Sequence, residues 1–205
     1  MKKLKRMASL SAGKCLDIGF AQKPNPFLSN VYGIDVQEVE KPVNYEKVFV
    51  VNLNKESLPF KEKEFDTVLV GDVIEHVENP SHILREINRV LKEKGKLILS
   101  TPHANHWWTT IHNWFLHPFI NDPDVGEHLN NWTIMDMKRL LKLNGFMVKK
   151  LWGTECYIPF ISINIPVKYF PRWGWIIIYE AQRVGEPVKV IYTNQKGNPI
   201  QVKTD

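Results

Sequence analysis

The sequence predicts an α/β fold built on a mostly parallel β-sheet. Short apolar runs typical of strands alternate with amphipathic helical segments over the first two thirds of the chain, which is the pattern of βαβ units. The 205 residues are enough for one domain with a substantial core, and 43% hydrophobic with 24% charged residues is an ordinary globular composition. Strands are expected at 14–19, 31–35, 48–53, 65–71, 96–102, 146–153 and 175–184.

Two helices carry clear start and stop signals. Asn79 and Pro80 supply a cap and a proline at the first helical position of one helix, and Gly95 is expected to stop it. Thr133 begins a second helix, which is expected to end at Gly145. A third helix is predicted over 105–116.

Two connections lack the helix that a parallel sheet normally requires. Pro24 and Pro26 restrict their own backbone and that of the preceding residues, so 20–30 holds at most one helical turn. Residues 36–47 show no helical period. The first two crossover helices are therefore expected to be short or missing.

Charge and cysteine content bound the cellular setting. The net charge is +5, and much of it lies in the first six residues, which we expect to be a solvated, frayed terminus; the alternative is a contact with phosphate or an anionic surface. The two cysteines are too few for a disulfide framework, which indicates a reducing, cytoplasmic location. The basic N-terminus lacks the apolar run of a signal peptide, and no segment has 18 uninterrupted apolar residues.

Polar and small residues recur where successive predicted strands end. In an open α/β sheet, ligands bind beyond the carboxyl ends of the strands. Each residue also has a plain structural reading: Gly19 can turn the chain, and Asp35 can cap a turn. Asp35 can equally accept both hydroxyls of a ribose, and Asn52 can pair with an adenine edge. The set comprises Gly19, Asp35, Asn52, Gly71, Asp72 and Thr101.

The stretch "FDTVLVGDVIEHVENPSHILREINRVLKEKGKLILSTP" at 65–102 resembles the core of class I S-adenosylmethionine-dependent methyltransferases of the small-molecule group. "LPF" at 58–60 and "GEHLNNWTIMDMKRLLKLNGFMV" at 126–148 are similar to other segments of that family. The resemblance implies a Rossmann-like, seven-stranded sheet whose last strand, 175–184, is antiparallel. It also implies a methyltransferase domain over 1–184, with 185–205 as an extension that forms a hairpin or a mobile tail.

The resemblance implies S-adenosylmethionine as cofactor. It assigns Asp35 to the ribose hydroxyls, Asn52 and Leu53 to the adenine, and Val73 to a position near the ring, with Val36 as a further cofactor-binding residue. The methionine part is assigned to Asp17, Gly19, Phe20, Ala21, Gly71 and Asp72. The chain departs from the family's G-x-G-x-G loop, because only the first glycine is present, followed by Phe20 and Ala21. The added side chains hinder but do not exclude close approach of the cofactor.

Histidines supply the candidate catalytic residues. His128 is the first candidate for a general base and His103 the second, since an oxygen acceptor needs a base that works near pH 7. A half-buried histidine that only makes a structural hydrogen bond is the alternative reading of His128. Four histidines, at 103, 106, 112 and 117, follow strand 96–102 and are expected to roof the acceptor site; their spacing matches no compact ligand pattern, so no metal is predicted.

The acceptor is predicted from absences and aromatics. The chain lacks N-P-P-[YF] and interleaved basic and aromatic stripes, so no nucleic-acid partner is expected. The tryptophans near the expected mouth form either a packed lid or a platform for a sugar or apolar acceptor. The segment 157–175 is either a packed loop or an interfacial patch for peripheral membrane contact. The short segment before the first strand suggests an open mouth for a bulky acceptor.

We therefore expect O-methylation of a small molecule, a saccharide or a lipid-linked glycan. Two other classes of function remain open at this point. One is a non-catalytic S-adenosylmethionine-binding domain or methyltransferase-like partner protein, because the first loop is eroded. The other is a dinucleotide oxidoreductase, which Gly19 and Asp35 also fit, although the third glycine and long first helix are missing. The sequence does not predict an oligomeric state.

Overall fold

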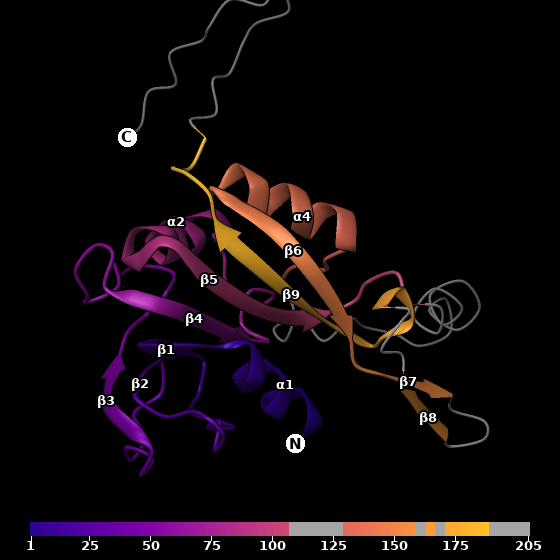
Figure 1. Cartoon of the computed structure of the whole chain (residues 1–205), viewed down its shortest axis with the longest axis horizontal. Coiled ribbons are helices and arrows are strands. Elements are labelled where there is room, and N and C mark those ends of the chain that lie inside the picture. The colour runs from indigo at the N-terminus through magenta and orange to yellow at the C-terminus, as the bar shows by residue number, and fades with distance from the viewer. Residues whose placement is uncertain (107–128, 159–162, 167–170, 189–205) are drawn as a thin grey trace, which may run out of the picture.

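The computed structural model describes residues 1–106, 129–158, 163–166 and 171–188, and the fold within them is a seven-stranded sheet with helices on both faces (Figure 1). The strand order is β3-β2-β1-β4-β5-β9-β6. The strands are β1 (Cys15–Ile18), β2 (Val31–Asp35), β3 (Tyr45–Val50), β4 (Phe65–Gly71), β5 (Leu91–Pro102), β6 (Phe146–Gly153) and β9 (Ile176–Arg183).

The pairing confirms a mostly parallel sheet with an antiparallel last strand. β1 runs parallel to both β2 and β4, so Asp17 lies between Gly33 and Leu69. β9 inserts between β5 and β6 and is antiparallel to both. The strand order changes direction at β1 and β4, and their carboxyl ends therefore flank the place where such sheets bind ligands.

The largest differences from the predicted strand boundaries are at β3, which also ends at Val50 rather than at 53, and at the start of β5. β3 begins at Tyr45 rather than at 48, because the Tyr45 ring is buried in the core while the chain after it is an exposed sheet edge. β5 begins at Leu91 rather than at 96, because the fully buried Leu91 pairs with Phe65 directly after the helix. Gly95 consequently lies inside β5. The prediction that Gly95 stops the helix was wrong, because the helix ends at Val90.

Two capped helices cover one face of the sheet, at the top in Figure 1. α2 (Pro80–Val90) begins as predicted, with the Asn79 side chain accepting from the His82 N–H. α4 (Ile134–Leu143) begins after Thr133, whose hydroxyl accepts from the Asp136 N–H at 3.1 Å. Their apolar sides pack on the larger core cluster, which includes Leu84, Ile87, Met137 and Leu141.

The opposite face is covered by a helix that was not predicted. α1 (Lys2–Leu10) packs there through Met7, which contacts the cluster containing Leu69 and Ile98. The expectation of a frayed, solvated terminus was therefore wrong, since burial of Met7 holds this segment on the sheet. The segments 20–30 and 36–47 contain turns and no helix, as predicted. α1 thus covers part of the face that the missing crossover helices leave open.

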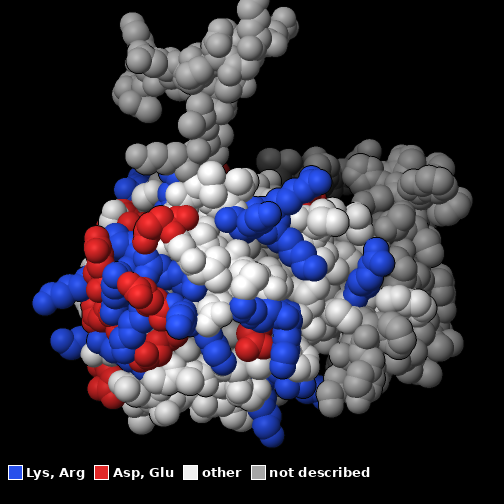
Figure 2. All heavy atoms as spheres, turned by 45° about the horizontal axis from the view of Figure 1, so that its top comes forward, with Lys and Arg blue, Asp and Glu red and all other residues white. Residues whose placement is uncertain are grey.

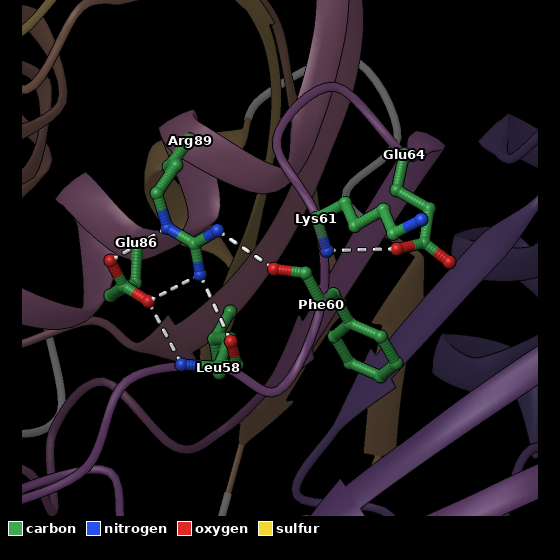
Figure 3. Close-up of polar contacts among 6 residues, drawn as sticks. All are labelled: Leu58, Phe60, Lys61, Glu64, Glu86 and Arg89. Carbon is green, nitrogen blue, oxygen red and sulfur yellow. Dashed lines mark hydrogen bonds and ion pairs between the residues drawn. The ribbon is translucent and has the colours of Figure 1, made fainter.

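Arg89 of α2 anchors the loop that leads into β4 (Figure 3). Its guanidinium donates to the carbonyls of Phe60 at 2.8 Å and Leu58 at 2.9 Å and also pairs with Glu86. The Glu86 carboxylate in turn accepts from the Leu58 N–H at 2.8 Å. Because this loop carries Leu53 and Asn54 on its way to β4, these bonds also fix one wall of the cavity described below.

The remaining described segments bear on other predictions. β7 (Glu155–Ile158) and β8 (Ile163–Pro166) form a separate two-stranded antiparallel sheet, which overlaps the segment 157–175 discussed above. A 3₁₀ turn follows at Pro171–Trp173. The helix predicted at 105–116 and the extension beyond 188 lie mostly or wholly outside the described residues. Among the described helices, none has the length and apolar character needed to cross a membrane.

Charged side chains of both signs are interleaved at one end of the visible surface in Figure 2, while the rest of that face is mainly uncharged with separate basic side chains. The surface ion pair Lys92–Asp66 joins β5 to β4, and Lys63–Glu93 joins the turn before β4 to β5. Exposed pairs of this kind contribute little to stability, so the fold depends mainly on its two core clusters.

Candidate active site

A cavity of about 470 Å³ opens at the carboxyl ends of β1, β2 and β4. Nine of the eleven residues predicted to bind the cofactor line it: Asp17, Gly19, Phe20, Asp35, Val36, Leu53, Gly71, Asp72 and Val73. A second hollow of about 440 Å³ lies between Glu93 and Glu186, at the amino ends of the parallel strands, where open α/β sheets do not bind their ligands. The first cavity is therefore the candidate active site.

Gly19 forms the tight turn that opens the cavity. Its φ of +80° lies in the left-handed region that favours glycine, and a Cβ there would stand 2.1 Å from Val73 Cγ2. The Gly19 N–H donates to the Ile34 carbonyl at 2.8 Å, which joins the turn to β2. Of the three glycines in the family's G-x-G-x-G loop, this chain keeps only Gly19, and a side chain at Gly19 would collide with Val73.

Asp17 is buried at the base of the cavity and is tied to the loop that follows. Its carboxylate accepts from the Tyr45 hydroxyl at 2.6 Å, and that hydroxyl accepts from the Asn25 N–H at 3.1 Å. Burial raises the pKa of Asp17 to about 7, while the hydrogen bond from Tyr45 and the charge of Lys3 act in the opposite direction. Burial is therefore the dominant influence on the Asp17 carboxyl.

Asp35 holds two loop amides and still has acceptor capacity. One carboxylate oxygen accepts from the Ala21 N–H at 2.8 Å, and the other accepts from the Gln37 N–H at 3.0 Å. Each oxygen of a carboxylate can accept about two hydrogen bonds, so one position per oxygen is left for a pair of hydroxyls. The loop-anchoring reading and the ribose reading of Asp35 are therefore compatible.

Asp72 lies on the β4 side of the cavity in a strained backbone conformation. Its φ is 56°, and its carboxylate accepts from the Ser100 hydroxyl at 2.6 Å. The other carboxylate oxygen forms an ion pair with Lys3 of α1. The carboxylate is thus fixed at the carboxyl ends of β4 and β5 and faces a cation within the cavity.

Two predicted residues do not line the cavity. Asn52 caps its own turn: its side chain accepts from the Asn54 N–H at 3.1 Å, and Asn54 lines the cavity instead. Ala21 uses its backbone N–H on Asp35. The Phe20 ring turns into the core, where it stacks against Tyr45 with ring centroids 5.0 Å apart and approaches Gly33. The bulk of Phe20 is thereby kept out of most of the cavity.

Glu75 was not singled out from the sequence. It is only 1% exposed, and Oε2 accepts from the Thr101 hydroxyl at 3.1 Å, whereas Oε1 has no hydrogen-bond partner among the described residues. Burial, followed by the nearby charge of Asp72, raises the pKa of Glu75 to about 7. The signal was present in "DVIEHV", where the acid precedes His76, a residue of the cavity wall.

The candidate bases lie beside or beyond the described cavity. His103 follows β5 and is buried, and its Nδ1 has no hydrogen-bond partner among the described residues. Burial and the neighbouring His106 and Arg172 lower the pKa of His103, so its imidazole is neutral at pH 7. His103 is not among the described lining residues, and His128 lies outside the described part of the chain.

Lys3, Leu4 and Met7 complete the cavity from α1, and the sequence did not predict this. Asn25 connects that helix to the cavity floor, because its side chain donates to the Leu4 carbonyl at 3.1 Å while its N–H bonds Tyr45. The buried Asn25 lies between the two prolines of "KPNP". The short connection after β1 thus holds α1 over the cavity through Asn25. A crossover helix would occupy this place in a longer connection.

The cavity suits a cationic nucleoside cofactor. The carboxylates of Asp17, Asp35 and Asp72 border one space, and at Gly19 the backbone leaves no side chain to obstruct a ligand. Asp35 has acceptor positions for ribose hydroxyls, and Leu53 and Val36 supply apolar wall. The residues present therefore fit S-adenosylmethionine, with Asp35 at the ribose and Asp17, Gly19 and Asp72 toward the methionine end.

The strand order, the antiparallel β9 and the position of the cavity define the class I methyltransferase fold. A family comparison agrees, since residues 12–99 match the methyltransferase domain. Among solved structures, an S-adenosylmethionine-dependent methyltransferase from Thermotoga maritima superposes with a TM-score of 0.69 at 17% identity, covering 88% of this chain and 87% of that one. The resemblance to a methyltransferase domain is thus confirmed over residues 12–99, and the solved structures confirm the fold.

Other relatives carry varied names. A Burkholderia thailandensis 1,6-didemethyltoxoflavin-N1-methyltransferase, solved with bound 1,6-didemethyltoxoflavin and S-adenosylhomocysteine, has a TM-score of 0.59 at 13% identity, covering 89% of this chain and 78% of that one. An uncharacterized protein of Methanocaldococcus jannaschii is 35% identical over 97 residues, which cover 47% of each chain. A demethylmenaquinone methyltransferase of Bacillus cereus is 33% identical over 72 residues, covering 35% of this chain and 30% of that one. The chain thus spans less than half the length of these curated relatives.

Proposed function

We propose that this protein is an S-adenosylmethionine-dependent methyltransferase that acts on a hydroxyl group of a small molecule, a saccharide or a lipid-linked glycan. The observation that carries the cofactor assignment is the single cavity in which Asp17, Gly19, Asp35 and Asp72 meet. When bound there, S-adenosylmethionine supplies an electrophilic methyl group. The protein's part is to hold the acceptor in line with that group and to exclude water.

Two buried groups support transfer to an oxygen acceptor. Loss of a hydroxyl proton needs a base that is unprotonated near pH 7. His103 is neutral there because burial lowers its pKa, and burial raises the pKa of Glu75 to about 7. The backbone N–H of Asn130 bonds the Glu75 carbonyl, and that of Ala104, next to His103, bonds the Trp132 carbonyl, so both candidates lie near the segment 130–132 beside the cavity. His128 stays a further candidate.

Exposed aromatic residues support a bulky or amphiphilic acceptor. Trp173 is 61% exposed and Trp175 is 42% exposed, and both lie just before β9 with Arg172 beside them. Aromatic rings with an adjacent cation are suited to sugar faces and to the membrane interface. The named relatives methylate chemically different acceptors, so family membership alone does not choose among them.

The proposal is tested in two steps with the full chain. Calorimetric titration with S-adenosylmethionine and S-adenosylhomocysteine should give saturable binding of both; no binding at millimolar concentration would refute the enzyme assignment. Isotopically labelled S-adenosylmethionine is then offered with saccharides, lipid-linked saccharides and small phenols, and mass spectrometry locates the added methyl group. Binding without transfer to any acceptor, or label on nitrogen or carbon, would contradict the proposed O-methylation.

A further inference from the structure

Lys3 is held inside the cavity by the packing of its helix. Met7, one turn further along α1, is 2% exposed and anchors the helix on the sheet, and the Leu4 carbonyl accepts from the Asn25 side chain at 3.1 Å. Lys3 and Leu4 line the cavity together with Asp17 and Gly19. The Lys3 ammonium is therefore a fixed part of the site.

The partner of Lys3 is the carboxylate of Asp72. That carboxylate accepts from the Ser100 hydroxyl at 2.6 Å, and the backbone that carries it is held by the Asp72 N–H, which donates to the Ser100 carbonyl at 3.0 Å. The side chains of Lys3 and Asp72 are 21% and 28% exposed, so the ion pair is partly withdrawn from water. The pair joins α1 to the end of β4 across the cavity.

The backbone of the first loop has few groups left for a ligand. The N–H of Gly19 bonds the Ile34 carbonyl, that of Ala21 bonds Asp35, and that of Lys23 bonds the Phe20 carbonyl. In a glycine-rich loop, such N–H groups are the usual donors to an anionic ligand group. A carboxylate entering this cavity therefore needs a side-chain cation.

We propose that the Lys3–Asp72 ion pair is the receptor for the amino-acid end of the cofactor, which inserts between the two side chains. The α-carboxylate of the ligand would pair with the Lys3 ammonium, and its α-ammonium would pair with the Asp72 carboxylate. Each side chain exchanges one ionic partner for another, so no charge is left uncompensated when the direct pair opens. This inference rests on the proposed use of S-adenosylmethionine and assigns α1 a direct binding role.

Lys23 is the competing cation, since it also lines the cavity. Its side chain is exposed, whereas Lys3 is half-buried and already faces a fixed carboxylate. A charge-assisted contact is stronger away from bulk water, where screening is weaker. The geometry therefore favours Lys3.

The test compares two ligands that differ only in the amino-acid end. S-Adenosylhomocysteine carries that end, and 5′-methylthioadenosine carries the same nucleoside thioether without it. Calorimetric titration of the full-length Lys3→Met variant should show about a tenfold to hundredfold loss of affinity for S-adenosylhomocysteine. Affinity for 5′-methylthioadenosine should stay within about twofold of wild type. Lys3→Arg should retain most of the S-adenosylhomocysteine affinity, and Lys5→Met, on the exposed side of α1, should match wild type.

The outcomes separate this inference from the proposed function. Wild-type chain that binds neither ligand would overturn both. Wild-type binding that Lys3→Met leaves unchanged, or a larger loss in Lys23→Met than in Lys3→Met, would overturn this inference alone. Equal loss of both ligands in Lys3→Met would show that Lys3 acts only by holding α1. If Lys3→Met does not fold by circular dichroism, Asp72→Asn provides the same comparison, with the same selective loss of S-adenosylhomocysteine expected.

Discussion

Gly19 is the residue on which the first loop depends most directly. An alanine there would have to adopt a left-handed backbone conformation and place its methyl group 2.1 Å from Val73 Cγ2. The valine side chain cannot easily move aside, because β-branched residues are stiff at χ1. We expect Gly19→Ala to lower the free energy of unfolding by about 2 kcal/mol. It should also weaken S-adenosylhomocysteine binding by at least about tenfold, because Val73 is pushed into the cavity.

Gly185→Ala is the matched control for that change. A Cβ at Gly185 meets nothing within 4 Å, and its φ is not in the left-handed region. Denaturant unfolding and ligand titration of the two variants side by side should therefore separate them. Similar stabilities and affinities in both would contradict the steric argument.

Glu75 gives the folded protein a pH dependence of defined sign. Its pKa is raised from 4.5 to about 7, mainly by burial, so between these values the folded chain keeps a proton that the unfolded chain releases. Stability from this group is complete below pH 4.5 and is lost as pH rises through 7. A shift of this size corresponds to roughly 3 kcal/mol.

The Glu75→Gln variant isolates that contribution. Glutamine stays neutral, can keep the contact with Thr101, and removes only the ionisation. From pH 4.5 to 8, wild type should lose roughly 3 kcal/mol of unfolding free energy relative to the variant, measured by urea denaturation. Asp17, whose pKa is also raised, titrates in both proteins and cancels in the difference. Parallel curves for the two proteins would show that Glu75 is not buried as a titrating acid.

At the residue scale, the sequence predicted the cavity residues that lie at strand ends. Asp17, Gly19, Asp35 and Asp72 could be found because the carboxyl ends of parallel strands meet at one edge of a sheet. Lys3 and Asn25 could not, since each enters the site through a contact with a residue distant in the sequence. The prediction that Asn52 lines the cavity failed for a local reason, because its side chain caps the turn that leads to Asn54.

At the element scale, the agreement depended on local signals. α2 and α4 have side-chain caps and a clear period, so their starts could be predicted. α1 has no side-chain cap and is only 9 residues long, and what stabilises it is Met7 packing on the sheet. The prolines correctly predicted that no helix follows β1, but not that α1 would cover the face left open.

Arg89 connects α2 with the loop before β4, and removing its guanidinium should destabilise the fold through that loop. Arg89→Met keeps much of the aliphatic packing but leaves the carbonyls of Leu58 and Phe60 without their donor. We expect a loss of about 2–3 kcal/mol in unfolding free energy, measured by denaturant titration. Arg85→Met, on the exposed side of the same helix, should change it by less than about 0.5 kcal/mol. Equal effects of the two substitutions would exclude the loop contacts as the cause.

At the scale of the whole molecule, Asn88 joins parts of the chain that are far apart in the sequence. Its amide donates to the carbonyls of Asn144 at 3.0 Å and Gly185 at 2.9 Å. Its side-chain oxygen accepts from the buried Arg183 guanidinium at 2.8 Å. One side chain of α2 thus holds the end of α4 and the end of β9, on the side of the sheet away from the candidate active site.

Removing the Asn88 side chain should lower the free energy of unfolding more than removing an exposed surface ion pair. Asn88→Ala leaves two carbonyls and a guanidinium without their partner in the interior, so we expect a loss of about 3 kcal/mol or more in unfolding free energy. Lys92→Met removes the ion pair with Asp66, whose side chains are 47% and 38% exposed, and should cost less than about 1 kcal/mol. Urea denaturation followed by circular dichroism measures both. If Lys92→Met proved as damaging as Asn88→Ala, the division of stability between buried network and surface charge would be wrong. Ligand affinity in folded Asn88→Ala should remain near wild type, because the residue lies outside the cavity that binds the cofactor.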